Sequence, residues 1–322
     1  MEHAANPAKL TEVELDRALR PTHFDGFRGQ EQVKLNLQVA VAAAKKRGTP
    51  LDHLLISGPP GLGKTTMAAI VAAELGANLV VVNAPSIKTK GELASLLASL
   101  NEGDILFLDE IHSLNPKVEE ILYPATEDYK LEVVAGNKAI TIKLKPFTLI
   151  GATTRAGMLQ RPMRDRFGIV AEMKPYSVSE LVDIVLDSSR KLGVSCSRSA
   201  ADEIAARSHG TPRLANRLLR RVQDTVDAYG RSGILTGEVY ETCERIGIDN
   251  FGLDSSTRGY LQILCDKGQP LALSSVVALT GESKDLVEEV IEPVLMRLGL
   301  IEKTPKGRVV TAKGRQHIQT EH

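Results

Sequence analysis

The residues most able to do chemistry lie in the run Leu54–Thr66, LLISGPPGLGKTT. Its centre, Gly58–Thr65, fits the pattern G-x-x-x-x-G-K-[ST] of a phosphate-binding loop (P-loop) at every defined position. The glycines let backbone N–H groups approach phosphate oxygens, and a following helix adds the positive end of its dipole. Lys64 suits the β- and γ-phosphates, and the Thr65 hydroxyl suits Mg²⁺. An ordinary glycine-rich loop is the alternative, but the apolar run before the motif and the helical pattern of Met67–Leu75 after it favour nucleotide binding.

Two acidic residues close a second apolar run, Ile105–Leu108. Asp109 and Glu110 therefore stand at the carboxyl end of a predicted buried parallel strand, where ligands bind in open α/β sheets. We expect Asp109 to hold Mg²⁺ through water and Glu110 to polarise the attacking water. A solvated acidic turn would also fit this dipeptide on its own, but its position after Lys64 favours the catalytic interpretation.

A third apolar run, Thr148–Thr154, ends in hydroxyl groups. Thr154 is placed to sense the γ-phosphate or the attacking water, although a strand-end cap fits this residue equally well. Arg166 lies in the run Arg164–Phe167, which we expect on an exposed turn. An arginine with no charge to meet in its own site can complete a neighbour's site as an arginine finger. The alternative is a surface salt bridge with Asp165, which would contribute little.

The composition bounds the class of protein. With 322 residues, 43% hydrophobic and 25% charged, the chain is typical of a soluble globular protein of two or three domains. The 40 basic and 40 acidic residues give zero net charge, which argues against a protein coated in nucleic acid and allows only a local DNA-binding patch. The three scattered cysteines predict neither a disulfide framework nor a zinc site, and they favour a cytoplasmic location. We expect no secretory signal and no membrane span.

The pattern changes from strands to helices near Tyr176. Four short helices are predicted, and they would form a small bundle: Ser177–Lys191, which starts with a capping box, Ala200–Ser208, Arg213–Tyr229 and Gly237–Ile246. Arg213 opens the longest of these helices, where it can reach the nucleotide and couple its presence to the orientation of the bundle.

The last part of the chain predicts a winged helix. Helical patterns cover Ser255–Lys267, Leu273–Leu279 and Ser283–Arg297, and a hairpin with a turn at Thr304–Gly307 follows. Between positions 297 and 315 the only acid is Glu302, whereas the basic residues are Arg297, Lys303, Lys306, Arg308, Lys313 and Arg315. Such a patch is suited to contact with DNA phosphates, although a solvated basic tail is the alternative.

Taken together, these motifs resemble the RuvB family of AAA+ ATPases, the bacterial motors of Holliday-junction branch migration. The resemblance runs from about Leu19 to Val310, and it rests on the segments Gly58–Thr66, Asp109–His112, Leu122–Ala125, Glu127–Tyr129, Phe147–Gly157 and Arg164–Val170. It implies an α/β fold: a large AAA+ ATPase domain over residues 1–176 with a parallel sheet and helices on both faces, a helical lid over 177–248, and a DNA-binding winged helix over 249–322.

The resemblance also implies roles for single residues. ATP and Mg²⁺ would be bound by Leu19 and Arg20 near the adenine, by Gly61, Gly63, Lys64, Thr65 and Thr66 at the phosphates and metal, by Tyr176 at the domain hinge, and by Glu127, Asp128 and Tyr129 at the subunit boundary. Arg213 would be the second sensor and Arg166 the finger that acts in trans. Lys284, Lys303 and Arg308 match the DNA-contacting positions of the family, and Lys306 is added from the basic patch.

The implied partners are the duplex arms of a four-way junction, further copies of the chain in a ring, which we expect to be a hexamer, and a RuvA-type junction-binding protein. The last would dock on the hairpin Val133–Lys143, whose turn is tighter than the family pattern. Lys303 and Lys306 replace arginines, which keeps the charge but loses bidentate phosphate contact. We therefore predict an ATP-driven DNA motor. The alternatives are an AAA+ switch of the clamp-loader or initiator type and a regulatory DNA-binding module whose ATPase no longer works as a motor. The runs LYPATEDY and GATTRAG favour the motor over the switch, and the module is disfavoured by an intact set of catalytic residues: Lys64, Asp109, Glu110, Arg166 and Arg213.

Overall fold

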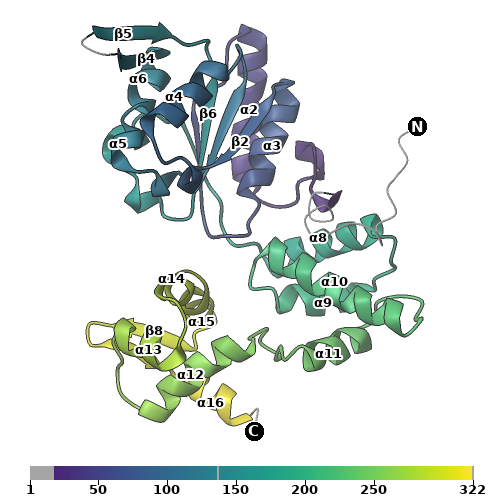
Figure 1. Ribbon diagram of the computed structural model, residues 1–322. Helices are drawn as coiled ribbons and strands as arrows, with labels where there is room; N and C mark the ends of the chain where they lie inside the picture. The colour runs from purple at the N-terminus through teal and green to yellow at the C-terminus, as the bar shows by residue number, and fades with distance from the viewer. Residues whose placement is uncertain (1–17, 136–137, 321–322) are drawn as a thin grey trace. The chain divides into compact units, whose positions relative to one another are not determined.

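The computed structural model describes residues 18–135 and 138–320, the side chains of 133–135 and 138–139 excepted, and the chain forms two compact units (Figure 1). The first unit extends to Ile184 and also includes Thr211–Arg213. The second unit comprises Val185–Gly210 and the chain from Leu214 onward. No helix in the described ranges is long and apolar enough to cross a membrane.

A five-stranded parallel sheet, in the order β2-β3-β6-β1-β7, forms the centre of the first unit. Its strands are β1 (Leu54–Ser57), β2 (Leu79–Asn83), β3 (Ile105–Asp109), β6 (Thr148–Thr153) and β7 (Ile169–Glu172). The predicted parallel sheet is therefore confirmed. Because every strand runs the same way, the carboxyl ends of the neighbours β3, β6 and β1 meet at one edge.

Helices cover both faces of this sheet (Figure 1). On one face, Leu55, Leu106 and Leu149 share a core cluster with residues of the helices α4 (Lys90–Ser99), α5 (Pro116–Glu119) and α6 (Leu122–Glu127). The residues that alternate with these leucines along each strand are buried on the opposite face. On that face α3 (Lys64–Leu75) contacts β3 and β6, and α2 (Glu31–Arg47) contacts α3. Burial on both faces explains why the central strands β1, β3 and β6 are apolar along most of their length rather than alternating between apolar and polar residues.

A hairpin extends from this unit. Strands β4 (Lys130–Ala135) and β5 (Lys138–Lys143) pair antiparallel, so the predicted hairpin is confirmed and begins three residues earlier than expected, at Lys130 instead of Val133. The predicted tight turn falls on positions 136–137, which lie outside the described residues. Short helical segments complete the unit: η2 (Phe24–Gly26), η3 (Ala84–Ser86), η4 (Ile111–Ser113), η5 (Ala156–Met158) and α7 (Arg161–Arg164).

The four lid helices form close to their predicted positions. They are α8 (Val178–Lys191), α9 (Arg198–Ala206), α10 (Pro212–Ala228) and α11 (Thr236–Arg245). The predicted capping box is present, since Ser177 Oγ accepts from the Glu180 amide at 3.3 Å and Glu180 Oε2 accepts from the Ser177 amide at 2.7 Å. Thr211 and the first two residues of α10, Pro212 and Arg213, belong to the P-loop unit, whereas the rest of the helix belongs to the second unit.

The C-terminal module has the predicted helices and wing, with two differences. It contains α12 (Ser255–Lys267), α13 (Leu273–Thr280), α14 (Lys284–Leu286), α15 (Glu292–Arg297), β8 (Ile301–Thr304), β9 (Gly307–Val310) and α16 (Ala312–Thr320). The predicted single helix over Ser283–Arg297 is interrupted by a π-helical segment, Val287–Ile291, just before Pro293, which has no amide hydrogen to donate to the preceding turn. Helix α16 was not predicted, because its sequence is short and largely polar.

Candidate active site and nucleic-acid interface

Backbone geometry makes the P-loop a cradle for an anion. Gly58, Gly61 and Gly63 have φ values of 142°, 78° and 99°, which disfavour residues with a side chain. A Cβ atom at Gly58 would also collide with the carbonyl oxygen of Met173. Helix α3 begins at Lys64, directly after the loop, so its N-terminal amides face the same space.

Lys64 is held inside this cradle. Its side chain is buried, and Nζ donates to the carbonyl oxygens of Gly58 at 2.8 Å and Pro59 at 3.0 Å. Burial lowers the pKa of the ammonium, and the carboxylates of Glu110 and Asp109 act in the opposite direction. Lys64 is therefore a preplaced cation near the carboxylates of Glu110 and Asp109.

The end of β3 carries two neighbouring carboxylates, Asp109 and Glu110. Burial raises the pKa of Asp109, and the neighbouring carboxylate of Glu110 raises it further. A divalent cation beside Asp109 and Thr65 would relieve both effects, so the residues fit Mg²⁺. Within the described residues no group of three or more His, Cys, Asp or Glu side chains could hold a metal alone. The fit therefore requires phosphate and water as the remaining ligands, which is typical of Mg²⁺ at nucleotide sites.

Glu110 is fixed by its backbone and by two neighbouring side chains. Its φ and ψ of 51° and 45° lie in the left-handed region, which is uncommon for a residue with a side chain and recurs at functional sites. Thr154 Oγ1 donates to Glu110 Oε2 at 3.2 Å, and Nδ1 of His112 lies 3.3 Å from the same oxygen. The structure thus brings Thr154 to the acid proposed as the catalytic base.

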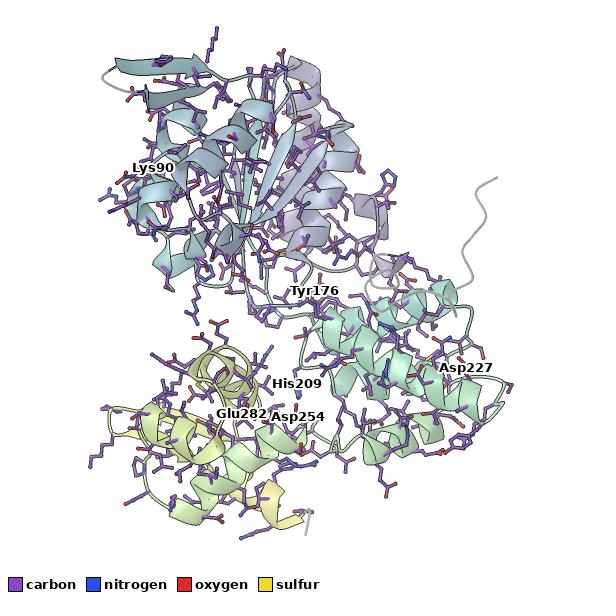
Figure 2. All side chains as sticks on the ribbon, in the orientation of Figure 1. Lys90, Tyr176, His209, Asp227, Asp254 and Glu282 are labelled. Atoms are coloured by element: carbon purple, nitrogen blue, oxygen red, sulfur yellow. The ribbon has the colours of Figure 1, made fainter. Side chains whose placement is uncertain are left out.

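The segments proposed as hinge and second sensor also contact the P-loop. Tyr176 (labelled in Figure 2) is buried, and its hydroxyl donates to the carbonyl oxygen of Leu62 at 3.2 Å. Burial raises the pKa of this phenol. The Arg213 amide donates to Gly61 O at 3.4 Å, and the charge of its guanidinium lowers the pKa of both Lys64 and Asp109. Arg213 therefore adds positive charge at the site.

For the remaining residues predicted to bind nucleotide, the structure gives their burial and their neighbours. Thr65 and Thr66 lie in the first turn of α3, and Thr66 is buried. Leu19 is buried and Arg20 is half-buried, so their assignment to the adenine rests on the family resemblance. Asp128 is exposed, 3.6 Å from Lys130, and the Tyr129 ring packs edge-on against Phe147 at 5.9 Å.

Arg166 follows α7 and is held by a partner that the sequence did not indicate. Its Nη2 donates to Glu127 Oε2 at 2.7 Å, and its guanidinium lies 5.8 Å from the centre of the Tyr123 ring. The alternative pairing with Asp165 is wrong, because Asp165 instead lies 3.6 Å from Arg161. The buried Nε of Arg166 has no hydrogen-bond partner among the described residues, so the guanidinium retains unused donor capacity.

The basic patch on the wing contains a buried acid that the sequence reasoning missed. Glu292 of α15 is fully buried and accepts from Arg308 at 2.7 Å, Lys303 at 2.7 Å and Tyr260 at 2.9 Å. Burial opposes ionisation, but the hydrogen bonds from Arg308, Lys303 and Tyr260 outweigh it and lower the pKa of Glu292. Glu292 lies outside the interval in which acids were counted, so only tertiary structure could reveal this pairing.

The predicted DNA-binding cations therefore differ in availability. Arg308 is largely buried, and two of its guanidinium nitrogens donate to the carboxylate of Glu292. Lys303 pairs with the same carboxylate. Lys306 is exposed at the wing turn, and Lys284 is exposed at the start of α14, 3.9 Å from Glu288. Lys306 and Lys284 are thus the freer candidates for phosphate contact.

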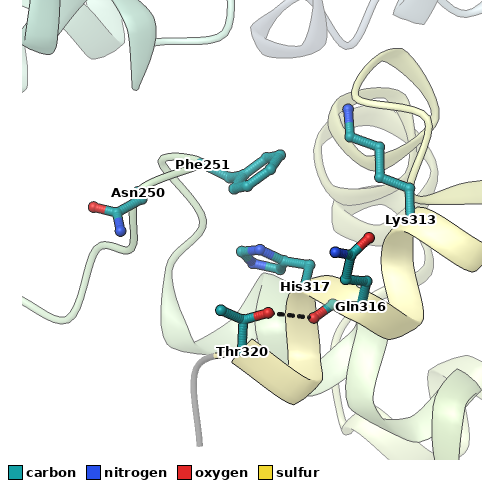
Figure 3. Close-up of a pocket in the computed structure, with 6 residues that line it drawn as sticks. All are labelled: Asn250, Phe251, Lys313, Gln316, His317 and Thr320. Carbon is teal, nitrogen blue, oxygen red and sulfur yellow. Dashed lines mark hydrogen bonds between the residues drawn. The ribbon is translucent and has the colours of Figure 1, made fainter.

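Helix α16 packs against the segment that leads into this module. His317 Nε2 lies 2.9 Å from the buried carboxylate of Asp249, and the His317 ring packs edge-on against Phe251 at 4.4 Å (Figure 3). The contact between Phe251 and His317 borders a pocket of about 320 Å³, and Lys313 also lines it.

Comparisons with known proteins relate each part of the chain to one protein family. Three family models match successive parts of the chain: the Holliday junction DNA helicase RuvB P-loop domain (residues 19–173), the RuvB AAA lid domain (176–249) and the RuvB C-terminal winged helix domain (250–319). The Holliday junction branch migration complex subunit RuvB of Campylobacter jejuni (strain RM1221) is 48% identical over 303 residues, which are 92% of this chain and 90% of that protein.

Solved structures agree. RuvB of Thermotoga maritima, described as a Holliday junction branch migration motor, matches with a TM-score of 0.87 and 44% identity over 94% of this chain and 98% of its own. A point mutant of that protein matches with a TM-score of 0.88 at the same identity and coverage. The predicted AAA+ core, helical lid and winged helix are confirmed.

Proposed function

The chain belongs to the RuvB family, and from that membership we propose how its residues carry out the family's reaction. The protein is an ATPase and an ATP-driven DNA motor of the branch-migration type, active on Holliday junctions in recombination and repair. The comparisons support this motor and not the clamp-loader or initiator switch. The observation that carries the residue assignments is the convergence of Lys64, Asp109, Glu110 and Thr154 at the carboxyl ends of three neighbouring strands.

The chemistry is phosphoryl transfer to water. Asp109 and Thr65 would hold Mg²⁺ beside the phosphates, and the ion would supply positive charge against the negative charge that develops on the transferred group. Lys64 would exchange its two carbonyl partners for phosphate oxygens, and the loop amides would bind the remaining oxygens. Glu110 would accept a proton from the attacking water, and Arg213 would link nucleotide occupancy to α10, the lid helix whose first turn contains it.

The site would be completed by a second copy of the chain. Arg166 is the proposed finger in trans, and Glu127 holds it in place until the neighbour's γ-phosphate offers a stronger partner. This arrangement supports a homo-oligomeric ring, which we propose to be a hexamer. Turnover would then depend on assembly, because an isolated subunit lacks the finger.

The remaining partners follow from the other surfaces. The winged-helix module would hold the duplex backbone of a junction arm through Lys306, Lys284 and Lys303. The hairpin β4–β5 exposes Ile140 and Ile142, which supports docking of a RuvA-type protein. We assign the protein to the cytoplasm, where its DNA substrate would be found, and we keep the predicted domains 1–176, 177–248 and 249–322 as functional units.

Steady-state ATP hydrolysis tests this function. We expect slow turnover by the chain alone, stimulation by duplex or four-way junction DNA, and loss of both in Lys64→Ala. Hydrolysis that ignores DNA under all conditions would instead support a switch whose turnover is incidental.

Replacing Lys306 with alanine should weaken DNA binding without destabilising the wing. Loss of one phosphate contact is expected to reduce the slope of log Kd against log salt by about 1 and to act equally on all sequences. By contrast, Arg308→Ala leaves the buried Glu292 with one cation fewer and should lower Tm as well. Fluorescence anisotropy over a salt series, together with thermal melting, separates the two effects.

The exposed Lys267 at the end of α12 provides a charge-matched control, Lys267→Ala. If Lys306→Ala and Lys267→Ala change the salt slope equally, the wing assignment is wrong.

A further inference from the structure

We propose that His112 is a positioning residue for ATP hydrolysis: its Nδ1–H holds one carboxylate oxygen of Glu110, so that the other oxygen faces the attacking water. This inference rests on the proposed ATPase site and names the group that orients its base. Neither motif chemistry nor strand-end placement assigned His112 a role.

The contacts of His112 form a small triangle. Its Nδ1 lies 3.3 Å from Glu110 Oε2 and 3.0 Å from Thr153 Oγ1, and Thr154 Oγ1 donates to the same Oε2 at 3.2 Å. In the described part of the chain no hydrogen bond or ion pair reaches the other carboxylate oxygen, Oε1. One oxygen of Glu110 therefore has two polar side-chain neighbours, Thr154 and His112, and the other is left to accept a proton.

The proposed contact requires one of the two ring tautomers. A carboxylate oxygen can only accept, so Nδ1 must carry a hydrogen to make a favourable contact with Oε2. The Thr153 hydroxyl already accepts from the Arg155 amide at 3.0 Å, and its second lone pair can share the Nδ1 hydrogen. The His112 side chain is only 10% exposed, and burial lowers its pKa, which favours a neutral ring; the proposal places the single hydrogen of that ring on Nδ1.

The local fold holds this triangle together. His112 lies in the turn η4, which contacts β6, the strand that ends at Thr153. Gly151 of β6 has no Cβ, and one built there would lie 3.0 Å from Ile111 Cδ1 and 2.9 Å from Phe167. Ile111 can therefore pack directly on β6, which sets the distance between His112 and the two threonines.

Substitutions that place an amide at one ring nitrogen or the other test the proposal. Asparagine puts its NH₂ near the position of Nδ1, whereas glutamine reaches the position of Nε2. We expect His112→Asn to keep most of kcat, and His112→Gln and His112→Ala to lose about 10-fold, a fraction of the 10²–10⁴ that a general base contributes. The Kd for a non-hydrolysable ATP analogue should change little in all three.

Controls separate positioning from folding. Ser113→Ala, an exposed change in the same turn, should match wild type in kcat and Tm. In a Glu110→Gln background, His112→Ala should cost almost nothing further, since both changes act on one group.

Equal kcat in the asparagine, glutamine and alanine variants would overturn the proposal. So would equal losses that follow Tm or nucleotide affinity, because such losses indicate a merely structural histidine. Absence of ATP hydrolysis in the wild-type protein would instead count against the proposed function itself.

Discussion

Replacing Arg166 with alanine is expected to reduce ATP turnover of the assembled protein by about 10³-fold or more, with ATP binding unchanged. The guanidinium extends from the turn after α7 and is half-exposed, with Glu127 and Tyr123 as its partners. A finger that meets the neighbour's γ-phosphate stabilises charge that exists mainly in the transition state, so its loss lowers kcat and spares affinity. Steady-state hydrolysis and equilibrium binding of an ATP analogue would measure the two quantities.

The matched control is Arg161→Ala. Arg161 is an exposed arginine on α7, and its acidic neighbour is Asp165. It should leave turnover close to that of wild type, because a surface ion pair contributes at most about 1 kcal/mol.

Mixing variants tests action in trans. Arg166→Ala subunits keep an intact P-loop, and Lys64→Ala subunits keep an intact finger. A mixture of the two inactive variants should recover part of the turnover, since some interfaces combine both intact parts. Normal hydrolysis by Arg166→Ala, or no recovery in mixtures shown to assemble, would contradict the finger assignment.

Replacing Glu110 with glutamine is expected to lower kcat by about 10²–10⁴ while ATP still binds. Glutamine keeps the shape and can still meet the Thr154 hydroxyl, but its amide cannot accept the proton from water. The substitution also removes a negative charge beside Asp109, so the affinity for ATP should not fall. Single-turnover hydrolysis with pre-bound ATP isolates the chemical step from binding.

Glu102→Gln serves as the control, because Glu102 is an exposed acid on the loop before β3. It should hydrolyse ATP at the wild-type rate. If Glu110→Gln retained more than a tenth of wild-type kcat, the base would have to be another group.

The positions of the candidate active-site residues could be predicted from the sequence because they follow from local patterns. The P-loop spacing specifies the backbone conformation that its glycines adopt, and the apolar runs place Asp109 and Thr154 at strand ends. A parallel sheet then brings those ends together without further information.

The partners of single side chains could not be predicted, because they depend on tertiary structure. Arg166 meets Glu127, 39 positions away, and the buried Glu292 takes up two cations of the wing. The contact of His112 with Glu110 depends on the left-handed backbone at Glu110 and on the packing of Ile111 over Gly151. None of these features leaves a periodic pattern in the sequence.

In the wing, the side-chain partners that the sequence could not predict decide which basic residues are available to bind DNA. Counted along the chain, its basic residues form one patch, yet the structure divides them into cations that fix the wing and cations open to solvent. Charge counts locate a DNA-binding surface, but burial decides which residues contribute to the salt dependence of binding.

The central claim is that ATP hydrolysis at this site moves DNA. The most direct test measures two rates on one labelled four-way junction, with purified RuvA-type protein present. These are the rate of ATP hydrolysis and the rate of branch-point movement, which is detected as separation of the labelled strands. We predict that both rates rise together with junction DNA, and that Lys64→Ala and Arg166→Ala abolish both. Turnover stimulated by the junction with no movement of its branch point would contradict the account.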